Sequence, residues 1–307
     1  MAQITREMFK PYHADKIEAE TISRPSTSLL KDAFRRLREN KLSMIGFWLV
    51  IFMILMSLLG PYMTEYSYRA IALADQNLGP SLEHWFGTDH LGRDVWARSW
   101  EGGRTSLLIG FFAAAIDLVV GVIYGAISGY SNRRVDQIMM RIVDVLYALP
   151  YLLVVILIMV AIDRQGILTI VLAIAATGWV GMARLVRGQV LQLKEMEFVL
   201  AARTLGANAR RLLFKHLIPN TLGLIIVNLT LTIPSAIFAE AFLSFIGIGI
   251  APPNTSWGLM INDGVAVMLT GYWWRLAFPA ILISITMFAF NVFGDGLRDA
   301  LDPRSRK

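Results

Sequence analysis

The sequence predicts an all-α protein that crosses a membrane six times, and three observations support this fold class. First, 55% of its 307 residues are hydrophobic and 17% are charged, and the mean hydropathy is +0.54, as is typical of integral membrane proteins. Second, the apolar runs approach the length of about 20 residues that a helix needs to cross about 30 Å of hydrocarbon. Third, lysine and arginine are distributed unequally between the two ends of these runs.

The apolar runs and the segments that join them define the expected organisation. The expected spans cover residues 42–64, 105–130, 138–162, 166–183, 221–250 and 273–294. The fifth run is too long for one straight crossing, and Pro234 within it predicts a kink or a break. The segment 251–272 is too polar to span, so we expect an outer cap or a re-entrant piece.

The cationic residues assign a side to each segment. With the tail 1–41 in the cytoplasm, all but six of the 29 lysines and arginines fall on the inner side, including those of the segment 184–220 and of the tail 295–307. The long outer loop 65–104 holds most of the other six. This bias predicts that both termini are cytoplasmic. The net charge of +6 then reflects topology, and we expect no nucleic-acid partner.

Several kinds of chemistry are disfavoured by the composition. The chain has no cysteine, so it has no thiol nucleophile or thiolate metal site. The histidines are scattered, and we expect no metal centre; they are His13, His84, His90 and His216. No G-x-x-x-x-G-K-[ST] loop is present to hold nucleotide phosphates, and no G-x-S-x-G motif indicates a hydrolase. We therefore expect a protein that is not an enzyme.

The most unusual segment is the charged stretch EFVLAARTLGANARRLLFKHLIPN, residues 197–220, between the fourth and fifth spans. Apolar residues fall at helical spacing up to Leu205, Gly206 permits a sharp turn, and a second helical pattern follows. Pro219 then begins the next span. The segment 184–220 is therefore predicted to contain a helical hairpin on the cytoplasmic face. Two interpretations remain open: docking on a partner, or an amphipathic helix on anionic lipid.

This stretch resembles the cytoplasmic loop signature of ATP-binding cassette (ABC) importer permeases, which reads E-A-A, three residues, G, nine residues, I-x-L-P. The matching positions are Ala201, Ala202, Gly206 and Pro219. The departures are His216, Ile218 and Leu200, which stand where the signature has its isoleucine, leucine and glutamate. Because Leu200 replaces the acid, an acidic contact cannot be carried over to that position, although Glu197 lies close upstream.

Four further segments narrow the resemblance. In chain order they read HWFGTDHLGRDVWARSWEGGRTSL, RIVDVLYALP, EAFLSFIGIGIAPPNTSWG and FNVFGDGLRDALDPR. Together they are similar to the peptide branch of this family, in the subunit type called OppC or DppC. The resemblance extends from about residue 30 to residue 304. Within it, the glycines of GTDHLGRD, residues 87–94, are typical of a turn, with ligand contact as the alternative.

The resemblance implies a type I ABC importer permease with a core domain of about residues 102–299, in the cytoplasmic (inner) membrane of a bacterium. It implies transport of oligopeptides by alternating access, with dipeptide or nickel import as alternatives. The implied partners are a homologous second permease, two ATPases that bind ATP and Mg, and an extracytoplasmic peptide-binding protein. The chain itself would bind no cofactor. The hairpin residues implied to couple to an ATPase are Glu197, Ala201, Ala202, Gly206, His216, Ile218 and Pro219.

Three acidic residues lie within the predicted spans, where a charge costs about 2.5–3.5 kcal/mol at the bilayer centre, so each should face protein or water. Asp117 lies near the middle of the second span, and Asp144 is expected to pair with Arg141, one turn away. Glu240 follows Pro234, and is interpreted as a pathway-facing acid or as a tie between helices. Asp117 and Glu240 also motivate an alternative function, a proton-coupled secondary transporter. We expect a roomy path without a sharply defined substrate site.

Overall fold

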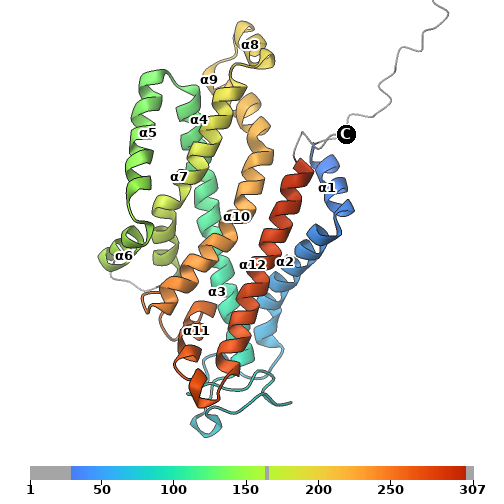
Figure 1. Ribbon diagram of the computed structural model, residues 1–307, viewed down its shortest axis with the longest axis vertical. Coiled ribbons are helices and arrows are strands. Elements are labelled where there is room, and N and C mark those ends of the chain that lie inside the picture. Colours follow the sequence, from blue (N-terminus) through green and yellow to red (C-terminus); the bar gives the residue numbers. More distant parts are fainter. Residues whose placement is uncertain (1–28, 163–165, 302–307) are drawn as a thin grey trace, which may run out of the picture.

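The computed structural model describes residues 29–162 and 166–301, and the predicted tails before residue 29 and after residue 301 lie outside this part of the chain. Long helices lie side by side along one axis (Figure 1). The described residues form no strand, and their β structure is limited to an isolated bridge between Thr88 and Asp94. The predicted all-α class is confirmed. The helices α1, α8 and α9 lie at one end with the C-terminal end of α12, and α11 lies at the other. The described segments predicted to be cytoplasmic and the segment predicted to be an outer cap therefore lie at opposite ends of the helices.

Five stretches of the described chain are long and apolar enough to cross a membrane: Lys41–Tyr62, Val95–Tyr130, Ile167–Leu193, Ala209–Phe245 and Trp274–Leu301. Their helices are α2 (Lys41–Leu59), α3 (Val95–Ile116) with α4 (Val122–Tyr130), α7 (Ile167–Leu193), α10 (Ile218–Phe245) and α12 (Trp274–Leu301). The pair α5 (Arg133–Ala148) and α6 (Tyr151–Ile162) makes a sixth if it crosses once. The shorter helices are α1 (Leu29–Glu39), α8 (Glu197–Thr204), α9 (Ala209–Arg211) and α11 (Trp257–Val265).

The third predicted span is not the single helix that was expected over 138–162. The helices α5 and α6 are bent by 88° at a break of two residues, Leu149 and Pro150. Leu149 has an extended backbone, with ψ 137°, because the ring of a proline disfavours the helical conformation in the residue before it. Of the kink or break expected at Pro234, the break is absent, since α10 continues through that residue, and the kink stays a prediction. Pro234 leaves the Thr230 carbonyl without its N–H donor, and membrane helices tolerate proline because neighbouring groups and local backbone adjustments satisfy such carbonyls. The Ser235 hydroxyl donates to the next carbonyl, that of Leu231 (2.8 Å).

Two other boundaries differ from the predictions because polar side chains extend the helices. The second span begins at Val95 rather than at residue 105, since the Asp94 carboxylate accepts the backbone N–H of Ala97 (2.7 Å) and caps α3. The fourth span continues to Leu193, well beyond the predicted end at residue 183. Charged residues of this extension form ion pairs with α5, described below, so the helix persists where its sequence is no longer apolar.

The membrane helices pack through small residues and buried apolar side chains. The main pairs are α2 with α12, α4 with α7, and α3 with α10. Along α4, glycines face α7 so closely that a Cβ on Gly125 would lie 2.3 Å from the carbonyl oxygen of Ala183. Close backbone approach of this kind replaces the hydrophobic driving force that is missing within lipid. α4 and α7 are thereby held together over their inner halves.

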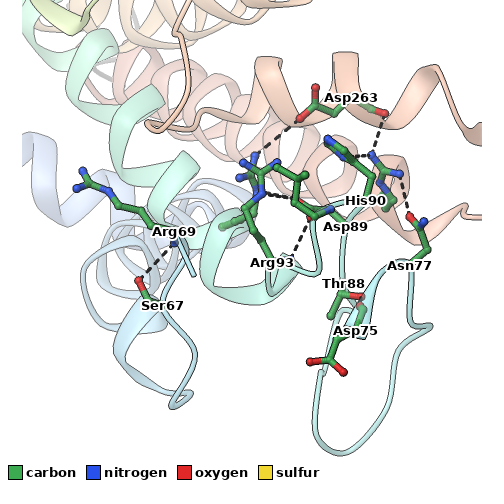
Figure 2. Close-up of polar contacts among 12 residues, drawn as sticks. Ser67, Arg69, Asp75, Asn77, Thr88, Asp89, His90, Arg93 and Asp263 are labelled. Carbon is green, nitrogen blue, oxygen red and sulfur yellow. Dashed lines mark hydrogen bonds and ion pairs between the residues drawn. The ribbon is translucent and has the colours of Figure 1, made fainter. Parts of the chain in front are cut away.

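At the opposite end, a cluster of charged and polar side chains joins the outer loop to α3, α11 and α12 (Figure 2). Asp89, Arg93, Arg98 and Arg275 are buried in it, and His90 is exposed at its edge. This outer charge cluster consists of Asn77, Asp89, His90, Arg93, Arg98, Asp263 and Arg275. Asp89 accepts from Arg93 Nε (2.7 Å) and lies 3.5 Å from Arg98 Nε. The turn predicted for residues 87–94 is confirmed, with Gly87 and Gly92 at φ 74° and 70°.

The cluster shifts the pKa values of two residues in the outer loop. Burial alone would raise the pKa of Asp89, but Arg98, Arg93 and two backbone N–H groups together lower it below its usual value. Burial lowers the pKa of His90, and Arg275 and Arg93 lower it further against the opposing effect of Asp89. Arg275 Nη2 donates to His90 Nδ1 (2.9 Å), so that nitrogen is the unprotonated acceptor of a neutral ring.

Replacing the central acid of the cluster should destabilise the fold. In Asp89→Asn, the buried Arg93 loses its counter-charge and the buried Arg98 keeps only the more distant Asp263 (3.8 Å), so we expect the free energy of unfolding to fall by about 3–5 kcal/mol. SDS titration in mixed micelles measures this value. The control is Glu83→Gln, an exposed acid in the same loop that accepts from the Tyr66 hydroxyl (3.1 Å) and should change little. Equal stability of the two variants would contradict the assignment.

Acidification should weaken the same end of the molecule through His90. The pKa of His90 is lower in the folded protein than in the unfolded chain, where it is about 6.5. The stability that neutral His90 contributes is therefore fully present above the unfolded pKa and is lost as the pH falls through the folded pKa. The thermal midpoint of the wild type should therefore fall between about pH 7.5 and 5. His90→Gln keeps an acceptor that does not titrate, and its midpoint should fall less. A fall that is the same in both proteins would show that His90 is not the responsible group.

Candidate functional site

The hairpin between α7 and α10 has the helix and the sharp turn that its sequence predicts. Its second helix is not separate from the next span, because α9 continues through a π-helical segment, Leu212–Leu217, into α10. α8 ends in a Schellman motif, in which Ala207 N–H donates to the Ala202 carbonyl (3.0 Å) and Gly206 N–H to that of Arg203 (3.0 Å). Gly206 has φ +82°, in the left-handed region that glycine adopts without strain. The Asn208 side chain then caps the next helix by accepting from the N–H of Arg211 (2.9 Å). The turn is thus defined by its own hydrogen bonds.

The hairpin is anchored at its base and exposed at its tip. Val199, Leu212 and Leu217 are completely buried, in a cluster that includes side chains of α4, α7 and α10. Leu205, beside the glycine turn, is 88% exposed, and Leu200 is also exposed. The anchored base prevents the hairpin from moving independently of α7 and α10, while its tip is free to contact another surface.

The structure separates the predicted hairpin residues into two groups. The exposed group consists of Glu197, Ala201, Gly206 and Pro219. The half-buried group consists of Ala202, His216 and Ile218, of which Ala202 and Ile218 pack against the buried cluster at the hairpin base. The surface available to a partner is therefore formed mainly by α8 and its turn, whereas His216 and Ile218 belong to the anchored part.

Two ion pairs connect α5 to the extended end of α7. Arg187 donates to both carboxylate oxygens of Asp136, each at 2.6 Å, and Arg184 Nη2 donates to Asp144 Oδ1 at 2.8 Å. The pairing expected between Asp144 and Arg141 is therefore wrong: the partner lies across the helix interface, where a cation meets the carboxylate more closely than along one helix. Asp136 and Arg187 were missed as a pair. Their opposite charges at the inner ends of neighbouring spans were the available signal.

Glu240 connects two helices deep in the protein. Its Oε2 accepts from the Ser106 hydroxyl of α3 (2.8 Å) and its Oε1 accepts from the Ser244 hydroxyl of α10 (2.7 Å). The side chain is 0% exposed and is not among the residues that line a cavity. Of its two interpretations, this geometry favours the tie between helices. An acid with both oxygens occupied by hydroxyl donors also avoids the cost of an unpaired polar group in hydrocarbon.

A cavity of about 700 Å³ opens between α3, α6, α7 and α10, and Asp117 lines it. Asp117 begins a π-helical turn, Asp117–Gly121, that joins α3 to α4. Its side chain is 7% exposed, and Oδ1 has no hydrogen-bond partner. Polar side chains of α10 line the same cavity: Asn228, Thr232 and Ser235. The cavity is within the size range of small-molecule sites, with a carboxylate in its wall.

Metal-ligating side chains do not gather in the described part of the chain: no group of three or more histidine, aspartate or glutamate residues has the geometry to hold an ion there. The described part of the chain therefore combines an anchored hairpin, a membrane cavity with one unpaired carboxylate, and charged ties at both ends.

Comparison with known proteins identifies the family of the chain. Residues 121–307 match the family described as binding-protein-dependent transport system inner membrane component, and residues 28–80 match the N-terminal TM domain of oligopeptide transport permease C. The dipeptide transport system permease protein DppC of Bacillus subtilis is 55% identical over 305 residues, 99% of this chain and 95% of that protein. The oligopeptide transport system permease protein OppC of the same organism is 54% identical over 307 residues, the full length of both.

One further relative and one solved structure are less similar to this chain. The oligopeptide transport system permease protein OppC of Escherichia coli is 40% identical over 295 residues, which are 95% of each chain. Among solved structures, an inward-facing MetNI methionine ABC transporter has a chain with a TM-score of 0.49 and 20% identity, covering 66% of this chain and 94% of its own. The family matches and the full-length relatives establish that this multi-pass membrane protein belongs to the inner membrane components of binding-protein-dependent transport systems, as a permease subunit and not an enzyme.

Proposed function

We propose that the chain is the transmembrane subunit of an ATP-driven importer that moves oligopeptides into a bacterial cell by alternating access. The observation that carries this proposal is the hairpin, which is anchored to the helices that line the cavity and exposes its tip. The two B. subtilis relatives are named for dipeptides and for oligopeptides at nearly equal identity, 55% and 54%, so peptides are the shared expectation. A cavity of about 700 Å³ favours the longer peptides. Dipeptide import is the second candidate.

In this proposal the tip of the hairpin docks on a cytoplasmic ATPase. The exposed apolar side chains Leu200 and Leu205 flank the small residues Ala201 and Gly206, a surface that a groove can cover closely. Leu200 replaces the acid of the family signature, so the contact depends on shape and apolar burial. A displacement of the tip would reach α7 and α10 through Val199, Leu212 and Leu217, and thereby the cavity walls.

The remaining partners follow from the cavity and the family. Exposed Leu231, Phe238 and Phe242 line the cavity together with polar groups, and polar groups left facing lipid would be costly. We assign this open side to a homologous second permease. The complete importer would add two ATPases, which bind ATP and Mg, and an extracytoplasmic peptide-binding protein, in the inner membrane.

Substitutions of Gly206 test the coupling role. Gly206→Val places a branched side chain at φ +82°, which costs about 1–2 kcal/mol in the left-handed region and should distort the turn. Gly206→Asn is tolerated in that region. We expect the Gly206→Val protein to insert normally but its ATP-dependent peptide uptake to fall at least about tenfold, which corresponds to a distortion of at least about 1.4 kcal/mol. The Gly206→Asn protein should retain most of its uptake. Uptake in right-side-out vesicles supplied with internal ATP and co-purification of the ATPase measure the two effects.

Two further variants separate strain from bulk. No atom lies within 4 Å of a Cβ built on Gly206, so the bulk of Gly206→Arg meets nothing within this chain, although φ +82° strains its backbone. Its loss of uptake beyond that of Gly206→Asn therefore reports contact with the partner. Gly188→Ala, in α7 and equally free of neighbours, is the control and should transport normally. Wild-type uptake by the Val and Arg variants would refute the hairpin assignment. Uptake that persists without ATP but stops when the proton gradient is removed would favour the secondary transporter instead.

A further inference from the structure

The carboxylate of Asp117 is the one feature of the membrane cavity that its surroundings do not explain. The side chain is 7% exposed, it lines a cavity of about 700 Å³, and its Oδ1 has no hydrogen-bond partner. It stands at the first residue of a π-helical turn, and such turns occur frequently at functional sites. By contrast, Glu240 at the interface of α3 and α10 has both oxygens occupied. Asp117 is therefore not a tie between helices.

The wall opposite Asp117 leaves space for its carboxylate and provides no cation. Gly178 of α7 faces it, and a Cβ there would lie 2.7 Å from Oδ1. Among the described residues that line the cavity, none is lysine, arginine or histidine, and no ion pair of Asp117 is found. An ionised carboxylate at this depth needs a counter-cation, because an unpaired buried charge is costly. When Asp117 is ionised, that cation comes from outside the described lining of the cavity.

The neighbouring polar groups are also suited to a donor-rich ligand. The hydroxyl of Thr232 donates to the Asn228 carbonyl (3.0 Å), and that of Ser235 donates to the Leu231 carbonyl (2.8 Å). With their hydrogens used in this way, both oxygens can only accept from a ligand in the cavity. A primary ammonium group carries three donors and a positive charge, which matches one carboxylate and a set of acceptor oxygens.

We propose that Asp117 binds the α-ammonium group of a peptide in transit, an inference that rests on the proposed function. The α-ammonium is common to unmodified peptides whatever their side chains, so this contact is compatible with a path that accepts varied sequences. A lysine side chain offers the same chemistry, and the experiment distinguishes the two sources.

The test compares two peptides in the complete importer reconstituted in liposomes with its binding protein. Tri-alanine has a free α-ammonium and N-acetyl-tri-alanine does not. Relative to wild type, Asp117→Asn should lower ATP-dependent uptake of tri-alanine about tenfold, as expected for one charge-assisted hydrogen bond. Uptake of the acetylated peptide should fall by less than about twofold. Because the binding protein is the same in both complexes, its own preference cancels in the ratio of variant to wild type.

Matched variants protect this comparison against effects on folding. Glu240→Gln makes the same change from acid to amide at an acid that does not line the cavity, and should leave the ratio between the two peptides unchanged. Gly178→Ala crowds the carboxylate without removing it and should reproduce the selective loss in a weaker form. Asp117→Glu keeps the charge and should retain more tri-alanine uptake than Asp117→Asn.

Binding is measured separately, since acetylation also alters delivery. Saturation-transfer NMR on the permease and ATPase complex without the binding protein should show contact with tri-alanine that Asp117→Asn abolishes, and weaker contact with the acetylated peptide. Equal contact of both peptides with the wild type would overturn the proposal. An equal fall in uptake of both peptides, or no fall, would also overturn it, and would assign Asp117 to structure or to a cation of the second permease.

A third peptide, N-acetyl-Ala-Lys-Ala, identifies the ammonium group. If its uptake is insensitive to Asp117→Asn, the α-ammonium assignment stands; if it falls as far as that of tri-alanine, a site for any ammonium replaces that assignment. The proposed function fails separately: a wild-type complex that moves neither peptide with ATP would refute peptide transport itself, whatever the variants do.

Discussion

The contact of α3 with α10, tied by the hydrogen bonds of Glu240, connects the parts of the molecule on which its other features depend. α3 begins at the outer charge cluster and ends at Asp117, and α10 continues from the hairpin and lines the cavity. The Ser106 hydroxyl of α3 donates to Glu240 of α10 and so joins the two helices, and Glu240 is 0% exposed. Replacing both partners by apolar groups could keep the packing, but removing one would leave a buried polar group without a partner. The helices that carry the two candidate sites are therefore held in one register.

Hydropathy and local backbone chemistry predicted the features that depend on a short stretch of sequence. The apolar runs gave the membrane helices because length and composition alone decide whether a helix can cross hydrocarbon. Gly206 gave the turn of the hairpin because few other residues adopt φ +82°. The bend before Pro150 was also local, and the rule that proline disfavours helix in the preceding residue could have found it. The apolar run through 138–162 concealed it.

The features that depend on contacts between helices could not be read in the same way. Asp144 pairs with Arg184, 40 positions away, and no single-helix spacing indicates that partner. The roles of Asp117 and Glu240 depend on whether a cavity or another helix lies beside each acid. Both are acids within apolar runs, and only the packing of α3, α7 and α10 shows that Asp117 lines a cavity whereas Glu240 joins two helices. Sequence therefore identified the candidates, and tertiary structure distinguished between them.

The exposed tip of the hairpin offers a physical reason why the missing signature acid need not abolish docking. Leu200 and Leu205 would face water on the cytoplasmic side, and burial of apolar surface stabilises by about 25 cal/mol per Å². Arg203, Arg210 and Arg211 are exposed in the same segment, so charge complementarity remains available from the arginines. With its base buried and its turn defined by backbone hydrogen bonds, the hairpin needs little ordering on binding, which reduces the entropic cost of association. Under the proposed function, shape and apolar burial therefore take the place of the acid.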